Sequence, residues 1–158
     1  MNSLLPLLLA FGIGVIAGLR AMTAPAVTAW AALLGRLNLS GTALAFMGSK
    51  WTVVVFTLAA LAELVTDQLP KTPPRTEPGP LVARIVMGGV SGACIAVAGG
   101  HSMWLGAVLG AVGAVAGTFA GYKARVGLVQ SLNVPDFAIA LPEDLVAIGL
   151  GWLLVTRF

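Results

Sequence analysis

Long apolar stretches that carry almost no charge are the feature that most constrains this chain. Of its 158 residues, 58% are hydrophobic and only 9% are charged, against roughly 25% charged residues in an average soluble domain. This number of charged side chains is too small to cover the surface of a water-soluble protein of this size. The outer surface is therefore expected to face lipid. The length fits one domain, and we predict an all-α, polytopic bundle of transmembrane helices.

About five membrane spans are predicted, because a helix needs about 20 apolar residues to cross a bilayer. They lie at about residues 4–34, 51–69, 81–99, 103–121 and 137–155. The first stretch is longer than one crossing requires, and Pro25 removes a backbone donor inside it, so we expect a kink or break between Gly18 and Pro25. Pro70 is expected to end the second span. Pro142 is expected to interrupt the fifth, and if it starts the last helix, residues 136–141 would form a separate piece.

Basic residues near the ends of the spans set the predicted orientation. Five spans place the two termini on opposite sides of the membrane. The N-terminal side would carry Lys71, Arg75, Lys123 and Arg125 with Arg84 close by, and the other side Arg36, Lys50 and Arg157. Because basic residues concentrate on the cytoplasmic side, this distribution favours a cytoplasmic N-terminus in the cell (inner) membrane.

Two pairs of short segments suggest an internal repeat. Gly14–Gly18 is similar to Gly113–Gly117, and Leu61–Val65 is similar to Leu141–Val146 with one insertion. One span separates the two pairs of helices, so the second pair would be inverted, as in many secondary transporters. The alternative is chance similarity among small apolar residues. It is favoured by the unequal predicted depths of the glutamates in the second pair of segments.

Charged side chains inside the spans form the candidate site, because each costs at least about 2.5–3.5 kcal/mol to insert and needs a partner or water. The residues predicted at one level are Glu63, Asp67, Arg84, Lys123, Glu143 and Asp144. One interpretation is a polar cavity, open to the cytoplasm, that binds an ion, a proton or a charged head group. The other is a set of salt bridges between helix ends, which we favour for Asp67, Arg84 and Lys123.

Arg20 and the acidic pair Glu143–Asp144 each allow two interpretations. The guanidinium of Arg20 cannot be neutralised, so it needs a carboxylate on another span or the carbonyls freed near Pro25. It could contact an anionic substrate or act as a structural lock. Pro142 followed by two acids is also the usual composition of a helix start, which would explain that pair without a ligand.

Glycines recur along the third and fourth spans and predict close helix packing. They are Gly88, Gly89, Gly92, Gly99 and Gly100 on the third span and Gly106, Gly110, Gly113, Gly117 and Gly121 on the fourth. Part of this surface is expected to form a homodimer.

Several kinds of chemistry have little material in this sequence. Cys94 and His101 are the single cysteine and histidine, so a metal site, a cofactor or a Ser-His nucleophile is not expected. The acids Glu63 and Asp67 have no accompanying nucleophile, so we do not predict an enzyme. The net charge of +3 is too small and scattered for nucleic acid, and it fits contact with anionic lipids.

Several short motifs occur in one order along the chain. The most specific are Gly18–Arg20, before Pro25, and the Glu-x-x-x-Asp-x-x-Pro segment Glu63–Pro70. The others are Gly48–Trp51, Arg84 before a glycine-rich span, and Glu143–Val146. Together they resemble a bacterial membrane family catalogued as domain of unknown function 4126. The resemblance implies an integral membrane protein of few spans and no particular activity. It matches the polar positions Arg20, Glu63, Asp67, Arg84, Glu143 and Asp144.

Two functions fit these observations. The first is a small transporter or channel-like protein in which Glu63 and Asp67 bind a cation or proton, and Arg20 pairs with them or with an anionic substrate. The alternative is a lipid-binding or scaffolding protein without transport activity. The residues predicted to bind substrate or ion are Arg20, Glu63, Asp67, Arg84, Glu143 and Asp144. The expected partners are membrane lipids, a second copy of the chain and a small ion or anionic ligand.

Overall fold

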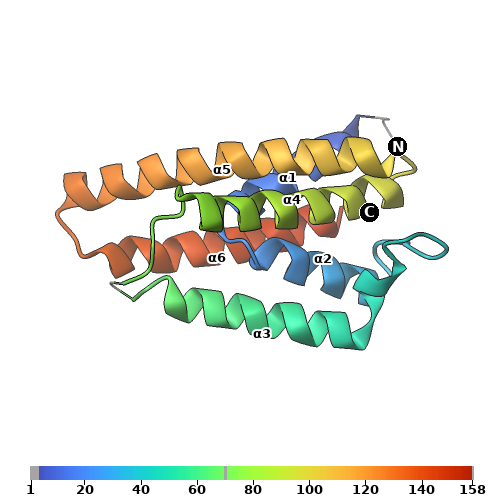
Figure 1. Ribbon diagram of the computed structural model, residues 1–158, viewed down its shortest axis with the longest axis horizontal. Helices are drawn as coiled ribbons and strands as arrows, with labels where there is room; N and C mark the ends of the chain where they lie inside the picture. Colours follow the sequence, from blue (N-terminus) through green and yellow to red (C-terminus); the bar gives the residue numbers. More distant parts are fainter. Residues whose placement is uncertain (1–3, 70, 158) are drawn as a thin grey trace.

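The computed structural model describes residues 4–69 and 71–157, and Pro70, the predicted end of the second span, lies outside these ranges. All regular structure in the described part of the chain is helical (Figure 1). The α-helices are α1 (Leu5–Leu19), α2 (Thr23–Leu33), α3 (Lys50–Thr66), α4 (Pro78–Ala98), α5 (Met103–Leu132) and α6 (Asp136–Val155), and the 3-10 helix η1 is Ala45–Gly48. Among the described residues, α4, α5 and α6 are long and apolar enough to cross a membrane, and α1 is apolar but shorter. The predicted helical membrane bundle is confirmed.

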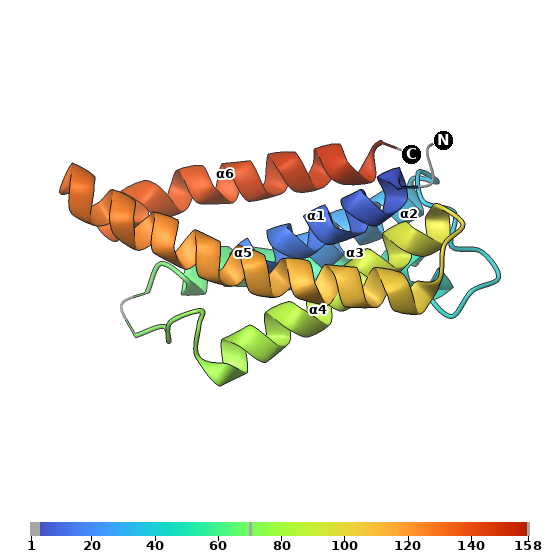
Figure 2. The ribbon, with the colours of Figure 1, turned by 90° about the horizontal axis from the view of Figure 1, so that it is seen from above.

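The first apolar segment breaks where expected and then turns back. α1 ends at Leu19, Arg20 has an extended backbone, and Pro25 lies in the first turn of α2, where a missing N–H is tolerated. Ile16 of α1 and Val27 of α2 both lie beside Gly151 of α6, so positions on either side of the break share one level. α1 and α2 therefore form a re-entrant hairpin that enters and leaves the bundle at the same end (Figures 1 and 2).

The hairpin places both termini at one end of the molecule, which we call the terminal end (Figures 1 and 2). The opposite end, which we call the polar end, holds the loop segments at residues 67–69 and 71–77 and the turn at residues 133–135. The prediction of termini on opposite sides is therefore wrong, because α2 returns instead of completing a crossing. Lys71 and Arg75 belong to the loop after α3, and Lys123 and Arg125 to the last part of α5, so all four lie towards the polar end.

Two helix boundaries also differ from prediction. α5 continues eleven residues beyond position 121, because charged side chains do not stop a helix. It ends at Asn133, which adopts the left-handed conformation (φ 50°), just before Pro135. α6 is continuous through Pro142, so residues 136–141 are not a separate piece. Ion pairs of Asp136 and Glu143 fix α6 on both sides of the proline.

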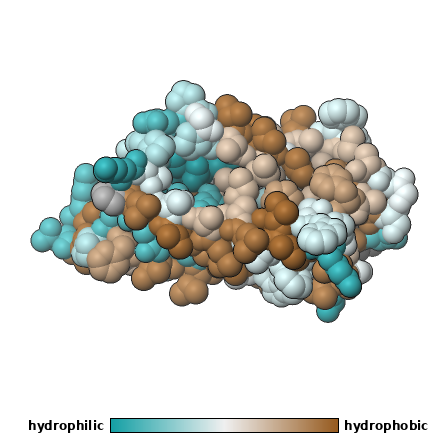
Figure 3. Space-filling view, turned by 60° about the horizontal axis from the view of Figure 1, so that its bottom comes forward, coloured by the Kyte–Doolittle hydropathy of each residue, from teal (hydrophilic) through white to brown (hydrophobic). Residues whose placement is uncertain are grey.

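Glycines bring α1, α4 and α5 into backbone contact. A Cβ on Gly110 of α5 would clash with the carbonyl of Gly88 on α4, and a Cβ on Gly14 of α1 would clash with the carbonyl of Gly110. Large apolar side chains lie instead on the outside, where brown surface borders a teal region towards one end (Figure 3). The three helices thus form a tight centre, and the outer face suits lipid.

The structure does not show the predicted inverted repeat. An inverted repeat requires every matched helix to be reversed, yet α1 and α5 run in the same direction while α3 and α6 run in opposite directions (Figure 1). The two matched glutamates do share a level. Glu63 lies 13 residues after the start of α3 at Lys50, and Glu143 lies 12 residues before the end of α6 at Val155.

Candidate functional site

Arg20 lies at the tip of the re-entrant hairpin and is completely buried. Its guanidinium forms ion pairs with Asp67, at the end of α3, and with Asp144 of α6. Its Nε atom is enclosed and has no hydrogen-bond partner among the described residues. A buried guanidinium needs such acceptors, and two carboxylates from different helices supply them.

Glu63 of α3 binds the part of the hairpin tip that follows Arg20. Its carboxylate accepts hydrogen bonds from the backbone N–H groups of Ala21 and Met22, each at 2.8 Å. These two N–H groups stand just before α2, where donors have no partner inside the helix. Glu63 therefore acts as a charged cap supplied by a neighbouring helix, and it fixes the point at which the chain turns back.

Arg84 of α4 faces the same hairpin tip. Its Nε atom donates to the carbonyl oxygen of Gly18 at 3.2 Å, and Nη1 donates to that of Pro80 at 3.4 Å. Its Nη2 atom lies 3.8 Å from Glu63 Oε1 and 3.8 Å from Asp67 Oδ2. These ion-pair distances exceed a hydrogen bond, so Arg84 is attracted to both acids without being tightly bound by either.

Two further arginines form ion pairs nearer the polar end. Arg75, in the loop after α3, donates through Nη1 and Nη2 to the two oxygens of Glu143 at 2.6 and 3.1 Å. Arg125 of α5 pairs with Asp136 through two nitrogens and lies 3.5 Å from Glu143. Such forked contacts are the strongest class of side-chain ion pair.

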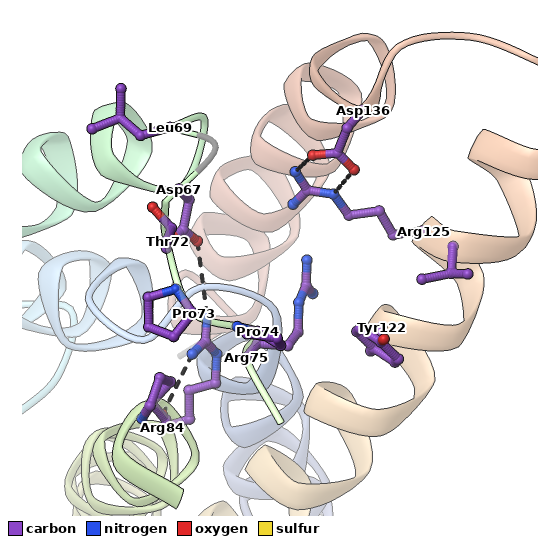
Figure 4. Close-up of a pocket in the computed structure, with 12 residues that line it drawn as sticks. Asp67, Leu69, Thr72, Pro73, Pro74, Arg75, Arg84, Tyr122, Arg125 and Asp136 are labelled. Carbon is purple, nitrogen blue, oxygen red and sulfur yellow. Dashed lines mark hydrogen bonds and ion pairs between the residues drawn. The ribbon is translucent and has the colours of Figure 1, made fainter. Parts of the chain in front are cut away.

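A cavity of about 340 Å³ lies at the polar end in front of these ion pairs (Figures 3 and 4). Its lining residues are Asp67, Leu69, Thr72, Pro73, Pro74, Arg75, Pro80, Arg84, Tyr122, Arg125, Val126 and Asp136. The lining thus carries three guanidinium groups and two carboxylates. Within residues 4–69 and 71–157, no three His, Cys, Asp or Glu side chains are grouped so that they could hold a metal ion.

The structure brings together the six residues singled out from the sequence and adds three more. Arg20, Glu63, Asp67, Arg84 and Asp144 form one network of ion pairs, and Glu143 belongs to a second network at the same end. Lys123, expected at the same level, is exposed and forms no ion pair within the described residues. The additional members are Arg75, Arg125 and Asp136.

One of these additional residues, Arg125, could have been predicted from the sequence. Antiparallel helices joined by a short turn bring together residues at equal distances from that turn. Arg125 lies seven residues before the end of α5 and Glu143 seven residues after the start of α6, and the two side chains meet. Arg75 had no comparable signal, because its position depends on the path of a loop.

The fold and the site define a helical membrane protein with a re-entrant hairpin and a charged cavity at one end. The chain belongs to the family described as domain of unknown function (DUF4126), whose model matches residues 7–157, nearly the whole chain. The family resemblance seen in the sequence motifs is therefore confirmed. No curated protein and no solved structure matches the chain.

Proposed function

We propose that this protein is a small membrane transporter or channel-like protein, and not an enzyme, with the charged cavity as its solute-binding site. The observation that carries this proposal is the cavity of about 340 Å³, lined by Arg75, Arg84 and Arg125 in an otherwise apolar bundle. Simple helix packing needs no charges, and buried ion pairs often stabilise a fold no better than apolar residues do. Their presence here supports a role in handling a polar solute.

The re-entrant hairpin supports the same proposal. Irregular backbone at membrane depth is tolerated where it is buried in protein or lines a watery space. Residues 20–22 lie directly behind the cavity and contact Glu63 and Asp67, and Asp67 also lines it. Transporters often place helix breaks of this kind at their binding sites. The hairpin tip is the barrier that a solute would have to pass to reach the terminal end.

The proposed orientation places the cavity on the cytoplasmic side, in the cell (inner) membrane. Basic residues are more numerous at the polar end, and cytoplasmic loops carry the excess of such residues. The polar-end residues are Lys71, Arg75, Lys123 and Arg125, and the terminal-end residues are Arg36, Lys50 and Arg157. Because both termini lie opposite the cavity, this orientation replaces the cytoplasmic N-terminus expected from five spans.

Flux measurements in liposomes test the proposal. Purified protein is reconstituted and challenged with gradients of small anions, cations and neutral metabolites. The matched variants are Val126→Trp, which fills the cavity without removing a charge, and Val55→Trp, at an exposed position on α3 outside the cavity lining. We expect a solute flux that is reduced by Val126→Trp and retained by Val55→Trp. Flux that is absent for every solute, or equal in all three proteins, would contradict transport through this cavity.

A lipid-binding role is the second candidate function. An apolar groove of about 440 Å³ between α2 and α3 is lined by Trp30, Leu33, Lys50, Val53, Val54, Thr57 and Leu58. It suits a lipid chain, with Lys50 near an anionic head group. Two basic residues at the polar end, Arg75 and Arg125, are paired with acids and are therefore poorly placed to hold lipid head groups. Native mass spectrometry of wild type and Lys50→Gln tests this role, since a retained anionic lipid should be lost in the variant.

A homodimer remains part of the proposal. The glycines that could have formed its interface are used inside the chain, as Gly88, Gly92, Gly106 and Gly110 show by their contacts with one another. A second copy would therefore have to bind another face. The same native mass spectra report the subunit number, and a monomer at all protein concentrations would exclude the dimer.

A further inference from the structure

The acceptor groups that line the cavity already have partners, whereas some of its donor groups do not. Its carboxylates are all engaged: Asp67 pairs with Arg20, and Asp136 accepts from two nitrogens of Arg125. Behind them, Glu143 accepts from Arg75. A cation entering the cavity would have to compete with guanidinium groups already in place. The acceptors are therefore a poor match for a free cation.

The donors are less fully used, and the clearest case is Arg84. This side chain is buried to more than nine-tenths and lines the cavity. Its Nη2 atom forms no hydrogen bond within the described residues, and its two nearest acidic oxygens are each 3.8 Å away. In Figure 4 Arg84 and Tyr122 lie on different helices around the same space, and the Tyr122 hydroxyl adds a second donor to the lining.

We infer that the cavity binds the carboxylate or phosphate group of a small anion through the Nη2 side of Arg84; this inference rests on the proposed function. A guanidinium presents donors in a plane that match two oxygens of one such group. Arg84 can accept this partner at little cost, because its contacts with Glu63 and Asp67 are long. Arg75 and Arg125, by contrast, would have to give up short forked pairs.

The position of Arg84 also connects the ligand to the hairpin. Its Nε atom donates to the carbonyl of Gly18, the next-to-last residue of α1 and two residues before Arg20. The acids it faces hold the tip as well, since Glu63 caps α2 and Asp67 pairs with Arg20. An anion that draws Arg84 towards the cavity would weaken its attraction to both acids. Binding would then loosen the contacts that keep the hairpin in place.

Binding is tested with the full chain purified in detergent, without any vesicle. Thermal unfolding and calorimetry are recorded with sodium acetate, sodium phosphate and sodium chloride at equal ionic strength. We expect wild type to show a saturable rise in Tm with acetate or phosphate, and little response to chloride. Whichever of the two anions gives the lower Kd identifies the class. Equal responses to all three salts would overturn the inference, because ionic strength alone would explain them.

Three variants locate the site. Arg84→Gln should abolish the response, and Arg84→Lys should weaken binding about tenfold or more, because an ammonium lacks the planar fork. Arg36→Gln removes an exposed arginine at the terminal end and should bind like wild type. Undiminished binding by Arg84→Gln would overturn the inference.

Val126→Trp covers the case in which Arg84→Gln fails to fold, because it keeps Arg84 and adds a bulky side chain to the cavity that both residues line. Loss of anion binding in that variant supports the site, and full binding overturns it. The outcome is separable from transport. Anion binding without flux would leave this site standing and remove the proposed function. Flux of a neutral or cationic solute without anion binding would do the reverse.

Discussion

At the scale of single residues, the buried guanidinium of Arg20 neutralises two carboxylates inside the bundle. Its side chain is fully buried, and the side chains of its partners Asp67 and Asp144 are 18% and 8% exposed. Arg20→Gln would leave both carboxylates without this partner. We expect the free energy of unfolding in detergent to fall by about 3–5 kcal/mol, the usual cost of breaking a buried ion pair.

The control for this prediction is Arg36→Gln, which should unfold like wild type. A triple variant, Arg20→Gln with Asp67→Asn and Asp144→Asn, should recover part of the loss, because it removes the unpaired charges. Equal unfolding of Arg20→Gln and wild type would show that the ion pairs are not needed to hold the hairpin tip.

Glu63 gives a second prediction at this scale. Replacing it with Gln removes the charge that accepts from the N–H groups of Ala21 and Met22. Hydrogen bonds to charged groups contribute about 1.5–3 kcal/mol, so amide hydrogen exchange at these two residues should quicken about tenfold or more. Glu77→Gln is the matched control, since Glu77 is exposed and its side chain does not cap α4. Unchanged exchange in Glu63→Gln would contradict the capping role.

The sequence identified individual polar residues better than it identified their partners. A charge inside an apolar stretch is visible at once, so Arg20, Glu63 and Asp144 could be selected from insertion cost alone. Their choice of partner depends on helix directions and loop paths. Arg75 lies in a proline-rich loop whose course no periodic pattern describes, and its pairing with Glu143 could not be predicted.

At the scale of helices, the packing of α5 against α1 and α4 depends on missing side chains. Gly110→Ala would place a Cβ against the Gly88 carbonyl and the Gly92 Cα, neither of which can move without shifting a helix. We expect a loss of about 1–3 kcal/mol in stability, the usual cost of overpacking. Gly127→Ala on the same helix meets nothing within 4 Å and should leave stability unchanged or raise it. Thermal unfolding of each variant measures this difference in stability. Equal melting curves would contradict close packing at Gly110.

The helices themselves were largely predictable, and the direction of α2 was not. The length of the apolar stretches predicted the bounds of α4 and α6 closely, and Pro25 predicted the break after α1. A proline shows where a helix must end but not which way the chain leaves. That choice is made by distant contacts, here the cap from Glu63 and the packing of Val27 beside Gly151.

At the scale of the whole molecule, the acidic residues are confined to one half. All six belong to the polar half, where six basic residues accompany them, and the segments at the terminal end carry Arg36, Lys50 and Arg157 with no acid. The re-entrant hairpin predicts that tags on the N- and C-termini report the same side of the membrane. In a Cys94→Ala background, a cysteine replacing the exposed Lys71 should react with an impermeant reagent from the opposite side. Tags on opposite sides would instead support five complete crossings.

The hairpin also has a consequence for the order in which the protein is assembled. Neither α1, with 15 residues, nor α2, with 11, is as long as the roughly 20 residues of a normal crossing. The first acid that pairs with Arg20 is made 47 residues later, and the second, Asp144, is near the end of the chain. The Gly110 backbone against which α1 packs is also synthesised long after α1. α1 and α2 therefore cannot complete their contacts until α5 and α6 have been made, and Arg20 has no acidic partner until the end of α3 is synthesised.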